Sequence, residues 1–170
     1  MDEKLVQVVD EQDTPLGGAS KAEIWRDGLL HRIVRVMVVN NEGRLLLQRR
    51  APHKLPFPDR WDVSTGGHVD EGEDYEEAAL RELSEENGIT GANLVYLGDF
   101  RSDSQYEWRK LRRFNRVYKV EVDTPVSLVP GDEDIAELRW MSIDEAREMV
   151  TTHPESVTDG LKVILERYFK

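Results

Sequence analysis

The sequence contains no cysteine among its 170 residues, which excludes disulfides, thiolate metal ligands and cysteine nucleophiles. Long apolar segments are also missing. The longest uninterrupted apolar run covers residues 36–39, far too few to cross a bilayer. The first residues, MDEKLVQVVD, have neither the basic start nor the apolar centre of a signal peptide. We therefore expect a cytoplasmic protein that does not enter a membrane.

Positive charge is in the minority, with 23 Lys and Arg against 34 Asp and Glu and a net charge of −11. This sign argues against binding to a nucleic-acid polymer or an anionic membrane, because both require a positive field. A small anionic substrate remains compatible with it, provided that a metal or a local basic patch meets the substrate. No Gly-, Ser- or Pro-rich linker divides the chain, so we expect residues 1–170 to form a single domain.

The residue patterns alternate between strands and helices. They predict strands over residues 5–9, 33–39, 45–48, 61–64, 93–101, 113–122 and 138–141, and helices over 20–27, 73–87, the segment after Ser142 and 155–169. Ser142 and Glu145 have the spacing of a capping box, which marks a helix start. This order is typical of an α+β (α/β) protein, in which helices sandwich a mixed β-sheet.

The most informative stretch is an acidic helix that follows two glycines, Gly66 and Gly67. It holds nine acids between positions 70 and 86: Asp70, Glu71, Glu73, Asp74, Glu76, Glu77, Glu82, Glu85 and Glu86. The last three are related by spacings of three and four residues, so their carboxylates can converge on one side of a helix. Such convergence is unfavourable without a cation, and Mg²⁺ or Mn²⁺ prefers carboxylate oxygens. The alternative is a solvated helix face whose repulsion is screened by water and salt.

The same stretch resembles the Nudix hydrolase signature at every specified position. That signature is Gly, five residues, Glu, seven residues, Arg-Glu, an apolar residue, any residue, Glu-Glu, any residue, Gly and an apolar residue. The matching residues are Gly67, Glu73, Arg81, Glu82, Leu83, Glu85, Glu86, Gly88 and Ile89. The resemblance implies a Nudix fold and metal-dependent hydrolysis of a diphosphate linkage in a small molecule. It is compatible with a homodimer, since family members are often dimers.

The resemblance also assigns roles to individual residues. It implies that Glu82, Glu85 and Glu86 bind metal and take part in catalysis, together with a backbone carbonyl of Gly66 or Gly67. It implies structural roles for Gly67, Glu73, Arg81 and Gly88, with Glu73 and Arg81 pairing to shape the loop. The general base is left open between Glu82 and an acid outside the motif; Glu107, Glu133 and Glu137 are the candidates.

The first half of the chain is similar to the Nudix branch of type 1 isopentenyl-diphosphate isomerases. This similarity makes His31 and His68 candidate metal ligands. It makes Arg49, Arg50 and Lys54 candidate diphosphate ligands. The alternative is a structural role for His31 and a polar loop position for His68. The isomerases carry a cysteine at the position of Gly66 and a degraded Nudix motif, whereas this chain has no cysteine and an intact motif. A second basic cluster, residues 109–116, is equally compatible with solvent-facing charge on a strand.

We therefore predict a Mg²⁺- or Mn²⁺-dependent pyrophosphohydrolase that acts on a nucleoside di- or triphosphate or a related nucleotide. Two alternatives remain open from the sequence. One is isopentenyl-diphosphate isomerase activity, and the other is a non-catalytic module that binds diphosphates.

Overall fold

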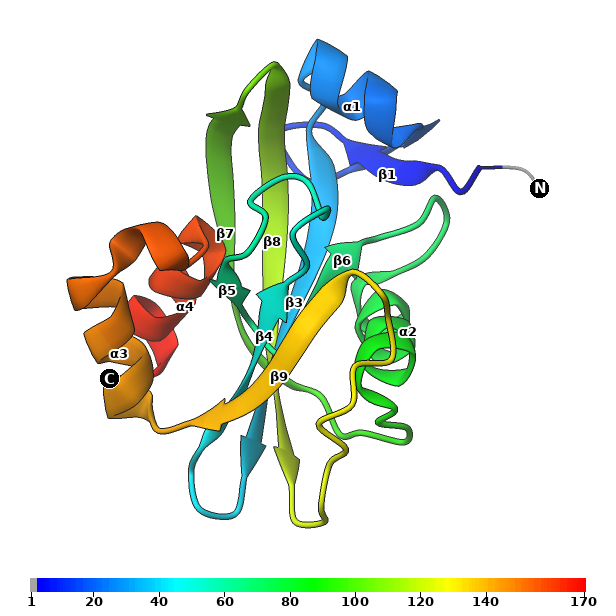
Figure 1. Cartoon of the computed structure of the whole chain (residues 1–170). Coiled ribbons are helices and arrows are strands. Elements are labelled where there is room, and N and C mark those ends of the chain that lie inside the picture. The colour runs from blue at the N-terminus through cyan, green and yellow to red at the C-terminus, as the bar shows by residue number, and fades with distance from the viewer. Residues whose placement is uncertain (1–2) are drawn as a thin grey trace.

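The computed structural model describes residues 3–170 (Figure 1). Within this range one sheet contains nine strands. They are β1 (Val6–Val9), β2 (Pro15–Ala19), β3 (His31–Asn40), β4 (Leu45–Arg50), β5 (Trp61–Asp62), β6 (Thr65–His68), β7 (Val95–Tyr106), β8 (Arg109–Val122) and β9 (Ile135–Met141). The helices are α1 (Lys21–Asp27), α2 (Tyr75–Asn87), α3 (Ile143–Thr152) and α4 (Asp159–Tyr168), with a 3₁₀ turn at Pro154–Ser156.

Strand β3 is the centre of the sheet. It pairs with β1, β4 and β6 in antiparallel fashion and with β8 in parallel, so the sheet is mixed. The hairpin to β4 forms because the Asn40 side chain accepts hydrogen bonds from the backbone N–H groups of Glu42 and Arg44, while Gly43 takes φ 75°. The expected α+β fold with a mixed sheet is confirmed.

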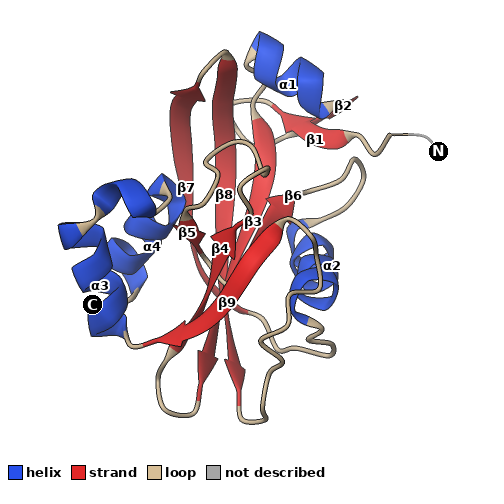
Figure 2. Cartoon of the chain, in the orientation of Figure 1, coloured by secondary structure: helices blue, strands red, loops and turns tan. Residues whose placement is uncertain are grey.

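Alternate residues of β3 face opposite layers. Val34, Val36 and Val38 pack in one core with α2, and Met37 packs in a second core with α4. Figure 2 shows α2 on one side of the sheet and α3 and α4 on the other. The expected sandwich of helices around a sheet is therefore confirmed. No helix between residues 3 and 170 is long and apolar enough to span a membrane.

Helix α2 begins and ends at local signals. Asp74 caps it by accepting a hydrogen bond from the Glu77 backbone, and Gly88 ends it with φ 66°. The helix therefore starts at Tyr75, two residues after the predicted start. The capping box of Ser142 and Glu145 at the start of α3 is present as predicted.

Several strand predictions were too short or missing. Residues 15–19, for which no strand was predicted, form β2, because β1 supplies a pairing partner for an otherwise weak strand sequence. Residues Thr65–His68 form β6, because β3 pairs with all four of them. Strand β7 extends to Tyr106 and strand β8 starts at Arg109. The hairpin that they form is therefore longer than the apolar pattern indicated.

Candidate active site

A cavity of about 440 Å³ is lined by residues of α2, of β6 and other strands of the sheet, and of the start of α4. Its lining brings together most of the residues that the sequence singled out: Gly66, Gly67, His68, Glu82, Glu85, Glu86, Arg50, Lys54 and Arg81. These residues come from β4, the loop after it, β6 and α2. The cavity is therefore the candidate active site, with acidic residues along α2 and basic residues from elsewhere.

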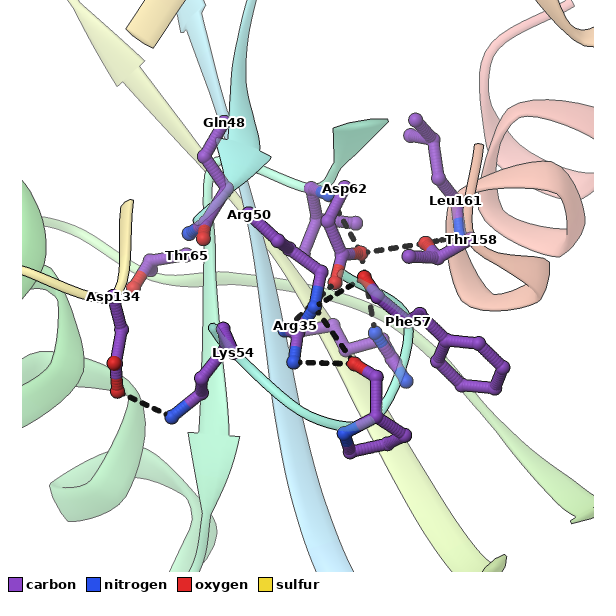
Figure 3. Close-up of polar contacts among 12 residues, drawn as sticks. Arg35, Gln48, Arg50, Lys54, Phe57, Asp62, Thr65, Asp134, Thr158 and Leu161 are labelled. Atoms are coloured by element: carbon purple, nitrogen blue, oxygen red, sulfur yellow. Dashed lines mark hydrogen bonds and ion pairs between the residues drawn. The ribbon is translucent and has the colours of Figure 1, made fainter. Parts of the chain in front are cut away.

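Glu86 is the most buried acid of the motif, with 8% of its surface exposed. Its Oε2 accepts hydrogen bonds from Thr65 Oγ1 at 2.6 Å and Gln48 Nε2 at 2.7 Å. Gln48 and Thr65 are adjacent in Figure 3. Burial, followed by the neighbouring carboxylate of Glu82, raises the pKa of Glu86 to about 8. Two donors thus fix a carboxyl group that is costly to ionise while no cation is near.

Glu82 lies beside Glu86 and against the backbone of β6. Burial raises the pKa of Glu82, although the guanidinium of Arg81 offsets part of this effect. A Cβ atom at position 67 would lie 2.2 Å from Glu82 Oε1, so only glycine leaves room for this carboxylate. Gly67 and Glu82, two residues of the signature, are therefore in direct steric contact.

Arg81 connects the loop before α2 with the acids of the helix. Its Nε and Nη2 donate to the two oxygens of Glu73 at 2.8 and 2.9 Å, and its Nη1 donates to Glu82 at 2.9 Å. Nη2 also donates to the backbone oxygen of His68 at 3.1 Å. Both side chains are partly shielded from solvent, so the pair ties the glycine segment to the helix.

The acids offer a partial site for a divalent cation. Glu82 and Glu86 present neighbouring carboxylates to the cavity, and such hard oxygen donors suit Mg²⁺ or Mn²⁺. Glu85 is half exposed and lies 3.5 Å from Arg81 Nη1. Between residues 3 and 170, no three His, Asp or Glu side chains converge closely enough to hold a metal as they stand. The oxygen donors of Glu82 and Glu86 fit such an ion.

The predicted basic residues separate into two groups. Arg50 lines the cavity and donates to the backbone oxygens of Pro56 at 2.8 Å and Phe57 at 3.1 Å. Figure 3 shows Arg50 beside Phe57. Lys54 also lines it and pairs with Asp134 at 2.6 Å. Arg49 points elsewhere: it pairs with Asp59 at 3.2 Å and Glu137 at 3.4 Å and is not part of the lining.

Two histidines are buried side by side. The rings of His31 and His68 are 5.4 Å apart between centroids. Burial lowers the pKa of His31 to about 4 and lowers that of His68 well below its ordinary value, so both rings are neutral at pH 7. The Nε2 atoms of both rings are buried and make no hydrogen bond within residues 3–170.

The acids considered as a base outside the motif do not line the cavity. Glu107 pairs with Arg109 at the β7–β8 turn, Glu137 on β9 pairs with Arg49, and Glu133 is exposed. Asp132 and Asp134, on either side of Glu133, do belong to the lining.

The sequence reasoning missed several polar residues of the lining: Arg35, Gln48, Asp62, Arg113 and Asp132. Arg35 lies in the middle of an apolar strand, where one charge gives no functional signal. Arg113 belongs to the second basic cluster, and only the strand register decides that it faces inward while Arg112 does not. A signal existed for Asp132, since it follows Pro130 and Gly131 in a polar loop near the other acids.

Comparison with known proteins decides the family. The sequence profile of the NUDIX domain matches residues 29–161. The chain belongs to the Nudix family. It is 37% identical over 152 residues to a Nudix hydrolase of Pseudomonas aeruginosa, covering 87% of this chain and 86% of that one. It is also 35% identical over 170 residues to an isopentenyl-diphosphate Δ-isomerase of Nocardia farcinica, covering 95% and 92%.

Solved Nudix structures agree with the fold. The crystal structure of DR0079 from Deinococcus radiodurans superposes with a TM-score of 0.78 at 27% identity, covering 97% of this chain and 99% of that one. As a member of this family with an intact signature, this chain is a pyrophosphohydrolase that acts on a diphosphate-containing small molecule. Nudix hydrolases generally use divalent metals, which agrees with the acidic wall of the cavity.

Proposed function

We propose that this Nudix hydrolase cleaves the diphosphate linkage of a nucleoside di- or triphosphate with the help of Mg²⁺ or Mn²⁺. The observation that supports this proposal is the polarity of the cavity. Neighbouring carboxylates of Glu82 and Glu86 line one wall, and Arg50 and Lys54 contribute positive charge to another. A substrate with dense negative charge needs both features, one to admit a metal and the other to bind phosphate oxygens.

The residues proposed to hold the cation are Glu82, Glu85 and Glu86, with a backbone oxygen of Gly66 or Gly67. A bound divalent cation lowers the pKa of a coordinated water and neutralises charge that develops on the phosphate oxygens. The contribution of Thr65 and Gln48 is to hold one oxygen of Glu86 in place by two short hydrogen bonds. Arg81 similarly restricts Glu82, and Gly67 leaves the space that this carboxylate occupies.

Glu82 is the motif acid that we propose as general base, because its carboxylate lines the cavity against the glycine backbone of β6. Arg50 would donate to phosphate oxygens, and Lys54 would exchange its contact with Asp134 for one with substrate.

The test is release of phosphate and pyrophosphate from a panel of small diphosphates, each assayed with Mg²⁺, with Mn²⁺ and with EDTA. The panel contains nucleoside di- and triphosphates, nucleotide sugars, dinucleoside polyphosphates and isoprenyl diphosphates. Glu86→Gln should abolish most of the turnover while the circular dichroism spectrum is unchanged. Glu76→Gln is the matched control, because it removes an exposed acid from the same helix. Full activity of Glu86→Gln, or turnover that is insensitive to EDTA, would refute the proposal.

A further inference from the structure

A group of arginines in the lining of the cavity has more positive charge than the carboxylates that pair with it. We name Arg35, Arg50 and Arg113 the arginine cluster. All three line the cavity, and their elements, β3, β4 and β8, are parts of the same sheet. Figure 3 shows Arg35 and Arg50 converging on Asp62, the acid that lies between them.

Asp62 is shared among several donors and cannot neutralise the cluster. It lies 3.4 Å from Arg35 Nη1 and 3.7 Å from Arg50 Nη1. Its Oδ1 also accepts a hydrogen bond from Thr158 at 2.8 Å. Two further acids of the lining, Asp134 and Asp159, are paired with lysines. Asp62 is the one carboxylate that forms an ion pair with the cluster among residues 3–170, so the cluster has two more guanidinium groups than paired carboxylates.

Arg113 is the member of the arginine cluster that lacks a hydrogen-bond or ion-pair partner for its side chain among residues 3–170. Its Nε atom is fully buried. It shares a strand face with Asn115, whose side-chain oxygen accepts from Arg35 Nε at 2.8 Å. Burial, followed by the charges of Arg35 and Arg50, lowers the pKa of Arg113 to about 9, which still leaves it charged at neutral pH. A buried donor without a partner is costly, so Nε of this arginine is better suited to a ligand than to packing.

The start of α4 is shaped around the cluster. A Cβ atom at position 160 would lie 2.6 Å from Arg35 Cζ, so glycine allows this guanidinium to lie against the first turn of the helix. Ser102 and Ser104 of β7 add hydroxyl groups to the same lining. An apolar group placed here would leave Arg113 Nε buried and unsatisfied, whereas an anion would satisfy it.

We propose that the arginine cluster is a subsite for a terminal phosphate group of the substrate, separate from the acids that the proposed function assigns to metal. A terminal phosphate carries about 1.5 to 2 negative charges at pH 7, which matches the excess of the cluster. A phosphate inside a capped diphosphate carries a single charge and has a substituent in the way. The subsite therefore selects nucleoside di- and triphosphates over nucleotide sugars and dinucleoside polyphosphates. This inference rests on the proposed function for the identity of the substrate, but the subsite itself binds without metal or turnover.

The first experiment is calorimetric titration of the full chain with inorganic phosphate at pH 7.5 in EDTA. Wild type should bind, and Arg113→Met should bind at least about tenfold more weakly, the loss expected for charge-assisted hydrogen bonds. Arg112→Met is the matched control, because the neighbouring arginine is outside the lining and pairs with Glu11 and Asp103. Arg113→Gln is a second neutral variant in case the methionine protein does not fold. Absence of phosphate binding by wild type, or equal binding by the neutral variants, would overturn the subsite.

The second experiment compares kcat/KM for a nucleoside diphosphate with that for the same nucleotide capped by a sugar. Arg113→Met should lower the first value about tenfold or more and leave the second nearly unchanged. Equal losses on both substrates would overturn the selectivity. If wild type binds phosphate through Arg113 but hydrolyses nothing, the proposed function fails and the subsite stands. If hydrolysis is normal but independent of Arg113, the proposed function stands and the subsite is overturned.

Discussion

Replacement of Glu86 by glutamine should separate activity from stability. The wild-type carboxyl group has its pKa raised from 4.5 to about 8 by burial and by Glu82. Folding therefore favours the protonated form. In the metal-free protein the stability that this group contributes is fully present below pH 4.5 and is lost as the pH rises through 8. Since each pKa unit corresponds to about 1.36 kcal/mol, the loss amounts to up to about 5 kcal/mol by pH 9.

Glutamine at this position remains neutral at every pH, and its side-chain oxygen can still accept the hydrogen bonds of Thr65 and Gln48. Without metal, Glu86→Gln should therefore be more stable than wild type by up to about 5 kcal/mol at pH 9 and nearly equal to it at pH 4.5. The measurement is urea unfolding in EDTA at pH 4.5, 7 and 9. Mg²⁺ should reverse the order at pH 9, because the ion stabilises only a protein that binds it.

The control for this prediction is Glu76→Gln, which removes an exposed acid from α2 and should leave the pH dependence of the free energy of unfolding unchanged. Parallel pH profiles for wild type and Glu86→Gln would contradict the reasoning. They would mean that water or a rearranged side chain already stabilises the ionised Glu86.

Three further predictions concern the rest of the acidic site. Gly67→Ala should lower kcat by about tenfold or more, because the added Cβ would lie 2.2 Å from Glu82 Oε1 and would displace this group; activity assays on folded protein check this. Arg81→Met should lower the free energy of unfolding by about 1 to 3 kcal/mol in urea titrations, because Glu73 loses its donors. Removal of divalent ions by EDTA should stop turnover, and added Mg²⁺ or Mn²⁺ should restore it; turnover that persists in chelator would contradict the assignment.

The acidic side of the site could be predicted from the sequence because its geometry is local. Glu82, Glu85 and Glu86 lie on one helix, so their spacing alone places them on one side of it. The helix boundaries follow from Asp74 and Gly88, which cap it through local hydrogen bonds. Helix spacing could not predict that the Glu85 carboxylate stays apart from those of Glu82 and Glu86. Its side chain lies 3.5 Å from Arg81 Nη1, and this contact depends on side-chain conformation.

The basic side of the site depends on contacts between segments far apart in the chain. Arg35 and Asn115 are separated by 80 residues in the sequence and form a hydrogen bond because β3 and β8 pair in parallel. A register shift of one residue would turn Arg113 out of the cavity and Arg112 into it. The residue pattern of β8 contains arginines at both positions, so the sequence alone offered no basis for choosing between them.

The similarity to isopentenyl-diphosphate isomerases is compatible with a hydrolase once the cavity wall is considered. The resemblance to these isomerases implies a cysteine at the position of Gly66. Here a Cβ at position 66 would already lie 3.1 Å from the backbone oxygen of Val34, so a side chain would be crowded. The cavity is also lined by Arg113, whose buried Nε atom an apolar substrate group would leave without a partner. The fold that the two activities share thus supports different chemistry because the side chains that line one cavity differ in charge.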